Sequence, residues 1–132
     1  MNFDNPQILN LSKFGSLDIG FLSVAEVENA IPFPIKRVYW VYQTPENQTR
    51  GDHANLINKQ VIICLNGTVE VFIQDQSGKH YPYILNDASK GLYIPAKHWR
   101  KMIFSENSIL LCICSEKFDD SDYIKDSDQF IH

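Results

Sequence analysis

One stretch of this sequence combines a histidine with side-chain amides and glycines. It runs from Arg50 to Gly67 and reads RGDHANLINKQVIICLNG. His53 is its best candidate for moving a proton near neutral pH, because the pKa of a free imidazole is about 6.5. Asn55 and Gln60 are neutral and suited to hydrogen bonding. The stretch predicts a polar pocket in which His53 is the leading candidate for a catalytic residue.

The spacing in this stretch is that of the metal site in cupin barrels. Such barrels have His, one residue, His, four residues, Glu, six residues and Gly, and the four places are taken here by His53, Asn55, Gln60 and Gly67. Divalent metals there need imidazole and carboxylate ligands, which amides replace poorly. Even with His98 from a later strand, the site would hold a metal weakly. We expect a cupin-type barrel without metal or other cofactor. A metal-dependent cupin enzyme, such as a dioxygenase, stays open as an alternative.

Short β-rich runs must position these side chains, because helical periodicity is weak throughout the sequence. Asn66-Gly67 and residues 76–78 each predict a hairpin, and residues 86–89 predict a further connection. Short strands at regular spacing are typical of an all-β antiparallel sandwich or barrel. The predicted strands are residues 37–42, 60–65, 68–74, 80–85, 91–94, 101–104 and 109–114, with one or two more in 16–26. The polar tail, residues 119–132, is expected to form a short helix or a docking segment.

Alternation within residues 37–42 predicts which side chains share a face. Val38, Trp40 and Tyr42 should lie on one face of this strand, and Tyr39 and Val41 on the other.

Composition limits the classes of partner. The chain has 132 residues, which fits one domain over residues 1–132. Its net charge of −4 argues against nucleic acid as a partner. We expect no membrane span, because there is no apolar run of about 18 residues. The N-terminus has no visible signal peptide.

The cysteines indicate a compartment. There are three, Cys64, Cys112 and Cys114. An odd number without a secretory signal is typical of the reducing cytoplasm. Cys112 and Cys114 are two residues apart in an apolar run, so on a strand they share a face. We expect a cytoplasmic protein with buried thiols in a sheet.

Four longer segments carry a family resemblance. They are IPFPIKRVYWVY (31–42), RGDHANLINKQVIICLNGTVEV (50–71), KGLYIPAKHWRKM (90–102) and FDDSDYIKDSDQF (118–130). In this order and at these separations, the sequence resembles the sugar 3,4-ketoisomerase family of WxcM-like cupins, which act on dTDP-4-keto-6-deoxyglucose. The resemblance covers nearly the whole chain, and four segments in register are more specific than one short motif.

The resemblance implies a jelly-roll homodimer that binds a thymidine-nucleotide sugar in the barrel and uses no metal. The family's base is the first His of an RGxHxH motif, which is His53 here. The second His is replaced by Asn55, a departure from the motif. The family's tyrosine after Lys-Arg-Val matches Tyr39. The position after the Trp of a late strand, His or Arg among members, is Arg100.

The residue types suit such a reaction. A ketoisomerase must remove and return a proton, which His53 could do, and must stabilise an oxyanion, which Tyr39, Arg50 or Arg100 could do. The substrate diphosphate needs cations such as Arg37 or Arg50. We expect further substrate contacts from Asn55 and Gln60 as hydrogen-bonding groups and from Trp99 by stacking.

These observations predict an isomerase that converts dTDP-4-keto-6-deoxyglucose into a dTDP-3-keto-6-deoxyhexose through an enediol. Arg100 resembles the family members with a gluco product, whereas Phe14 matches neither type of member at its position. The product would feed synthesis of a 3-amino deoxysugar for surface polysaccharide, such as the O-antigen of lipopolysaccharide. The alternative, motivated by Asn55, is a non-catalytic cupin that binds nucleotide sugars. Asp119, Asp120 and Asp122 are interpreted as a solvated acidic turn.

Overall fold

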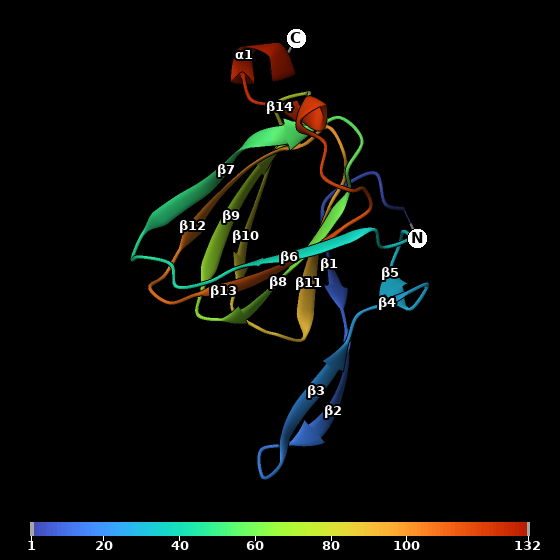
Figure 1. Ribbon diagram of the computed structural model, residues 1–132, viewed down its shortest axis with the longest axis vertical. Coiled ribbons are helices and arrows are strands. Elements are labelled where there is room, and N and C mark those ends of the chain that lie inside the picture. Colours follow the sequence, from blue (N-terminus) through green and yellow to red (C-terminus); the bar gives the residue numbers. More distant parts are fainter. Residues whose placement is uncertain (1, 132) are drawn as a thin grey trace.

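Two five-stranded antiparallel sheets face each other and form the body of the molecule (Figure 1). The computed structural model describes residues 2–131. The first sheet has the order β1 (Gln7–Asn10), β11 (Lys90–Ile94), β8 (Gln60–Asn66), β13 (Ile109–Cys114) and β6 (Arg37–Val41). The second has the order β10 (His80–Leu85), β9 (Val69–Gln74), β12 (Trp99–Phe104), β7 (Gln48–Asn55) and β14 (Tyr123–Ile124). The predicted antiparallel jelly-roll barrel is confirmed.

Several small elements lie outside the barrel. The hairpin of β2 (Ser12–Ser16) and β3 (Gly20–Val24) projects from one end of it, and β4 (Glu26–Val27) pairs with β5 (Ala30–Ile31) nearby. At the other end, η1 (Asp120–Asp122) precedes β14, and the chain closes with the short helix α1 (Ser127–Ile131). The predicted C-terminal helix is therefore present. None of the helices in residues 2–131 has the length and hydrophobicity needed to cross a membrane.

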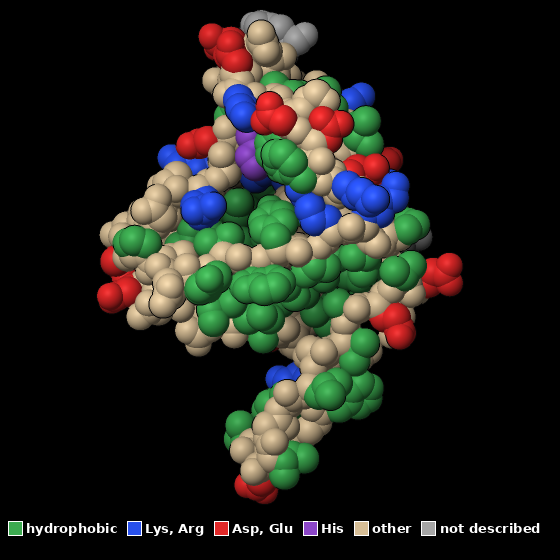
Figure 2. Space-filling model, viewed as in Figure 1, with side chains coloured by type: hydrophobic (Ala, Val, Ile, Leu, Met, Phe, Trp, Pro, Cys, Tyr) green, Lys and Arg blue, Asp and Glu red, His purple; other side chains and the backbone are tan. Residues whose placement is uncertain are grey.

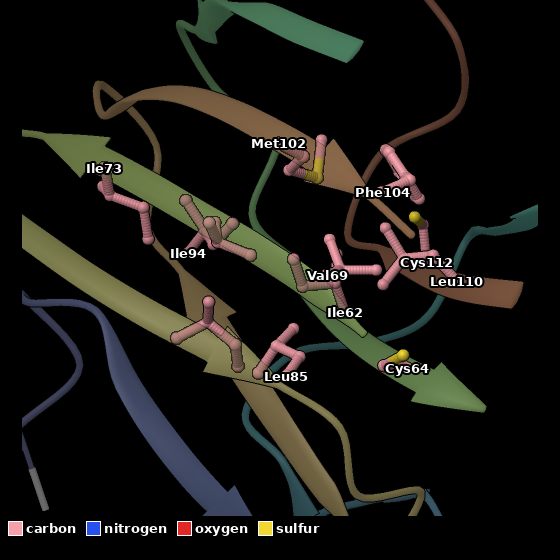
Figure 3. Close-up of a cluster of buried hydrophobic side chains, with 12 residues drawn as sticks. Ile62, Cys64, Val69, Ile73, Leu85, Ile94, Met102, Phe104, Leu110 and Cys112 are labelled. Atoms are coloured by element: carbon pink, nitrogen blue, oxygen red, sulfur yellow. The ribbon is translucent and has the colours of Figure 1, made fainter. Parts of the chain in front are cut away.

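The main core fills the space between the two sheets (Figure 3). Strands place every second side chain on one face, so β8 contributes Ile62 and Cys64 while β9 contributes Val69, Val71 and Ile73. All three cysteines are buried and free, as the sequence predicts. The core leaves an open space between β6 and β7.

The Asn66-Gly67 turn connects the two sheets. The sequence predicts a hairpin here, and this expectation is wrong, because β8 and β9 belong to different sheets and do not pair. Gly67 has φ +80°, and a Cβ at this position would meet the Ser108 hydroxyl at 2.6 Å. The turn therefore needs glycine to pass the chain from one sheet to the other. The hairpin predicted at residues 76–78 is confirmed by the pairing of β9 with β10.

The faces of β6 follow the predicted alternation. Tyr39 and Val41 pack against the main core, whereas Val38 and Trp40 point outward and are exposed. Strand β7, in the other sheet, is not among the strands that the sequence predicts, because its sequence QTRGDHAN contains no apolar alternation.

Candidate functional site

A cavity of about 630 Å³ opens between β6 and β7. Its lining includes four of the side chains proposed from the sequence, Arg37, Tyr39, Arg50 and His53. Figure 2 shows Lys and Arg side chains around a hollow that contains hydrophobic side chains. The cavity thus combines cations at its edge, an imidazole and a phenol.

A β-bulge in β7 presents His53 to this cavity. In the pairing with β12, His53 lies opposite Arg100 while Gly51 lies opposite Lys101, so Asp52 is an extra residue. Gly51 and Asp52 have φ values of +92° and +55°. A Cβ on Gly51 would lie 3.0 Å from the Arg100 carbonyl oxygen. Bulges re-aim side chains in this way, and this one explains why a glycine stands two residues before the histidine.

The His53 imidazole is half-buried and neutral at physiological pH. Burial and, to a smaller extent, the positive charge of Arg100 lower its pKa from 6.5 to about 4. The Gly51 carbonyl and the Asn55 side chain oppose this shift. The ring lies 4.7 Å from that of Tyr123. A neutral imidazole is the form that a general base requires.

A chain of hydrogen bonds runs beneath the cavity from Arg100 to Tyr39. Nη1 of the fully buried Arg100 donates to Gln60 Oε1 at 2.6 Å, and Gln60 Nε2 donates to the Tyr39 hydroxyl at 2.9 Å. The Arg100 guanidinium also donates twice to the His98 carbonyl. Burial lowers the pKa of Arg100 to about 10, so it remains charged at neutral pH.

Tyr39 is held as a neutral hydrogen-bond donor. Burial is the main cause that raises its pKa above the ordinary value, and the hydrogen bond from Gln60 opposes this shift. Because the phenol oxygen accepts from Gln60, its own O–H is left to donate elsewhere. The arrangement suits stabilisation of an oxyanion in the cavity.

Four predicted site residues lie apart from the lining. Asn55 is 1% exposed, and Gln60 and Arg100 are also buried beneath the cavity. Trp99 lies on the other face of β12 from Arg100, and its ring packs 5.8 Å from that of Phe130. Stacking of Trp99 on a substrate is therefore not supported, because alternation along β12 turns it away from the cavity.

Within residues 2–131, no group of three or more His, Cys, Asp or Glu side chains is arranged to hold a metal ion. His53 has the amides of Asn55 and Gln60 at the neighbouring positions of the motif.

Comparison with known proteins identifies the family. Residues 4–132 match the family model FdtA, described as WxcM-like, C-terminal. The chain belongs to the FdtA family. It is 33% identical over 126 residues to a TDP-4-oxo-6-deoxy-α-D-glucose-3,4-oxoisomerase of Aneurinibacillus thermoaerophilus, covering 94% of this chain and 88% of the relative.

Two solved structures from Campylobacter jejuni have the same fold. WlaRA, a TDP-fucose-3,4-ketoisomerase, has a TM-score of 0.89 and 36% identity, over 96% of this chain and 93% of its own. WlaRB, a TDP-quinovose 3,4-ketoisomerase, has a TM-score of 0.90 and 35% identity, over 97% and 98%. The family resemblance seen in the sequence is thus confirmed. The near-equal identities do not distinguish between the two sugars.

Two functional candidates in this FdtA family member were missed from the sequence. Asp122 was interpreted as part of a solvated turn, but it is buried and accepts hydrogen bonds from the Ile57 and Asn58 backbones and the Asn55 side chain. Tyr123, which follows it, lines the cavity. The matching segment 118–130 was the available signal, although nothing local distinguishes Asp122 from the exposed Asp119 and Asp120.

Proposed function

We propose that this protein is a TDP-sugar 3,4-ketoisomerase, acting on TDP-4-keto-6-deoxyglucose to give a TDP-3-keto-6-deoxyhexose without a cofactor. The observation that carries the proposal is one cavity lined by a neutral imidazole, His53, and a neutral phenol, Tyr39, in an FdtA family chain. Relatives that share at least a third of its residues carry the names of such isomerases.

The proposed reaction moves one carbonyl by proton transfers alone. His53 removes the proton from carbon 3, and the C–H electron pair forms a C3–C4 double bond while the C4 carbonyl becomes an oxyanion. The Tyr39 hydroxyl donates a hydrogen bond to that oxyanion. The O3–H bond then breaks, its electron pair forms the C3 carbonyl, and a proton returns to carbon 4. The proton released from O3 passes to the C4 oxyanion, which becomes a hydroxyl. Substrate and product are isomers, so no oxidant is consumed.

Cations near the mouth suit the diphosphate. Arg37 and Arg50 line the cavity from opposite sheets, and guanidinium groups bind phosphate oxygens well. A bound diphosphate would also raise the pKa of His53 above about 4, because nearby negative charge favours the imidazolium. Substrate binding would therefore make His53 a stronger base.

We further propose a gluco product, on the family resemblance at Arg100. In the structure Arg100 lies opposite His53 across β12 and β7 and is linked to Tyr39 through Gln60. It would act through these two groups on the face of the enediol that receives the proton. The proton coupling constants of the product at carbon 4 would test this assignment, and a galacto product would contradict it.

A homodimer is proposed from the hairpin of β2 and β3. Its exposed large hydrophobic side chains are between 52% and 93% accessible: Phe14, Leu17, Ile19, Phe21 and Leu22. Within the described residues, the two strands pair only with each other. Val38 and Trp40 add exposed apolar surface on β6. Apolar surface on this scale is typical of an interface, and a second copy of the chain is the proposed occupant.

The dimer can be tested with Leu22→Asp. A carboxylate on the hairpin would be buried without a partner in the dimer, so the variant is expected to run as a monomer in light scattering after gel filtration. The matched control is Ile84→Asp, since Leu22 is 59% and Ile84 65% exposed. A monomeric wild-type protein, or a dimeric Leu22→Asp variant, would contradict this interface.

The cellular role proposed is supply of a 3-keto sugar to an aminotransferase, for a 3-amino deoxysugar of surface polysaccharide such as O-antigen. We propose the cytoplasm as its location, supported by three free buried thiols. The chain, residues 1–132, is proposed to act as one domain.

Solvent deuterium exchange tests the activity. Wild-type protein is incubated in D₂O with TDP-4-keto-6-deoxyglucose, and we expect deuterium at carbon 3 or 4 together with a 3-keto product by NMR. The His53→Asn variant should lose turnover by at least about 10³-fold, because the base is removed. Tight TDP binding by calorimetry without exchange would favour the non-catalytic alternative. Unchanged turnover in His53→Asn would remove His53 from the mechanism.

A further inference from the structure

The segment near the C-terminus pairs with the strand that carries the proposed base and contacts the base itself. This C-terminal strap, residues 119–125, contains η1, β14 and Lys125. Tyr123 pairs with Asn55 in the antiparallel ladder between β14 and β7. Its ring lies 4.7 Å from that of His53. The strap therefore packs directly on the proposed base.

Asp122 is the polar anchor of the strap. Its Oδ1 accepts from the Ile57 amide at 2.6 Å, and its Oδ2 accepts from Asn55 Nδ2 at 3.1 Å and from the Asn58 amide at 3.3 Å. Every one of these partners is a donor, and two of them are backbone groups that cannot reverse. A carboxylate accepts from all three, whereas an amide side chain could not.

Asp122 thereby fixes the orientation of the Asn55 amide. With Nδ2 donating to the carboxylate, the amide oxygen must face the other way. Asn55 and His53 are two residues apart on β7, so their side chains share a face. Within residues 2–131, Asn55 Oδ1 and His53 Nε2 are both buried without a hydrogen-bond partner. The Asn55 side chain also raises the pKa of His53 by hydrogen bonding, as an acceptor facing the imidazole does.

We infer that Asp122 is a positioning residue, which aligns the Asn55 carbonyl with the His53 imidazole so that a proton taken by His53 is stabilised. The inference rests on the proposed isomerase function. It also assigns a role to Asn55. This residue replaces the second histidine of the motif, and the buried Asp122 carboxylate orients its amide so that the carbonyl oxygen is the acceptor.

The charged and titratable groups around His53 are consistent with this role. Arg100 on β12 and Lys125 on the strap are cations, and both lower the pKa of His53. Tyr123 from β14 is in ring contact with it. The Asn55 side chain acts in the opposite direction and raises that pKa. If the Asn55 amide lost its orientation, the Gly51 carbonyl, which also raises that pKa, would be left to offset the two cations.

The decisive variant is Asp122→Asn, which keeps the shape of the side chain. The introduced carbonyl is expected to stay on the Ile57 amide, which makes the shortest of the three hydrogen bonds at 2.6 Å, so the introduced NH₂ faces Asn55 Nδ2 and the Asn58 amide. The Asn55 amide must then reverse to avoid two facing donors, whereas the Asn58 amide loses its acceptor equally in this variant and in the paired one below. An N–H would then point at His53. We expect kcat to fall about 10- to 100-fold with KM nearly unchanged, because the base is misaligned rather than the nucleotide.

A paired substitution separates alignment from simple loss of stability. In Asp122→Asn combined with Asn55→Asp, the new carboxylate accepts from the introduced amide and still presents an oxygen to His53. We expect kcat within about threefold of wild type. Asn55→Asp alone sets two carboxylates against each other and should not recover activity. Asp120→Asn is the matched control, because Asp120 is an exposed carboxylate on the same turn whose partner among residues 2–131 is Lys125.

NMR of ¹⁵N-labelled histidine gives a readout that is independent of turnover. With the His53 signal assigned from the His53→Asn variant, Asp122→Asn should lower the His53 pKa, and the paired variant should raise it above the wild-type value. An unchanged His53 titration in Asp122→Asn, or a kcat loss that follows the melting temperature and is not rescued by the pair, would overturn the inference. A wild-type protein without deuterium exchange would defeat the proposed function, while the titration would still decide the role of Asp122.

Discussion

Strands β6 and β7 line the same cavity from opposite sheets, but they hold their side chains there by different means. Tyr39 is placed by regular alternation along β6 and fixed by a hydrogen bond from Gln60 on β8. His53 is placed by a bulge in β7 and held against the strap through Tyr123. The phenol thus rests on ordinary sheet geometry, whereas the imidazole depends on a local distortion and on a distant segment of the chain. Substitutions in the two strands should therefore change kcat and stability in different ways.

After His53→Asn, the largest effect is expected on the β6 side from Tyr39→Phe, which removes only a hydroxyl. Loss of one donor to a developing oxyanion costs about 10²- to 10³-fold in kcat. The melting temperature should change little, because the ring still packs against the core. Steady-state kinetics and thermal melting check both statements. Tyr83→Phe, which removes a hydroxyl bonded to the Pro6 carbonyl, is the control and should keep wild-type kcat; a full-rate Tyr39→Phe would remove Tyr39 from the reaction.

On the β7 side, Gly51→Ala tests the bulge. At φ +92° a Cβ is strained, and it would lie 3.0 Å from the Arg100 carbonyl oxygen. We expect about 1–3 kcal/mol lower stability and a kcat lower by about 10- to 100-fold as His53 shifts.

Gly78→Ala is the matched control for the bulge. Gly78 has the same φ of +92°, but its nearest neighbour would be a side-chain atom at 3.9 Å. This variant should share the backbone strain and keep kcat, measured by urea unfolding and steady-state kinetics. Equal kinetics for the two variants would show that the bulge does not position the base.

The smallest and most gradual effect concerns pH. A base with a pKa of about 4 stays neutral at pH 5, so kcat/KM should persist there and fall only as pH approaches 4. The sign for stability follows from linkage: the folded state binds fewer protons than an unfolded histidine of pKa 6.5, so stability is full above about pH 6.5 and decreases towards pH 4. Urea unfolding of wild type and His53→Asn should show the weaker pH dependence in the variant. An acid limb near pH 6.5 would contradict the buried, Arg100-opposed imidazole.

The strands that could be predicted from the sequence are those whose apolar residues alternate or run together. Strands β6, β8 and β13 are of this kind, since one or both faces pack against hydrophobic side chains. Strand β7 could not be predicted this way, because its inner face borders a cavity and its sequence is polar. It is a strand because β12 and β14 pair with it. The Asn66-Gly67 turn was misjudged for a related reason: local turn chemistry does not reveal which sheet the next strand joins.

The site was predictable where motif and alternation coincide. His53, Tyr39, Arg37 and Arg50 line the cavity as such patterns suggest. Trp99 does not line the cavity, because the next residue on β12, Arg100, takes the inner face. The burial of Asp122 could not be predicted, because its three hydrogen-bond donors lie in residues 55–58, more than 60 positions earlier in the chain. Contacts between residues so far apart in the sequence produce no periodic pattern in it.

The guanidinium of Arg100 has one more consequence. It is fully buried, and within residues 2–131 its hydrogen-bond partners are the neutral His98 carbonyl and Gln60 amide. A buried cation that is hydrogen-bonded only to neutral groups lowers the free energy of unfolding, so it makes the protein less stable. An anion that binds near Arg100 restores part of this stability, because it binds the folded state and not the unfolded chain. The nucleotide sugar would therefore act as a folding ligand as well as a substrate, and the protein's lifetime would depend on the supply of the molecule it acts on.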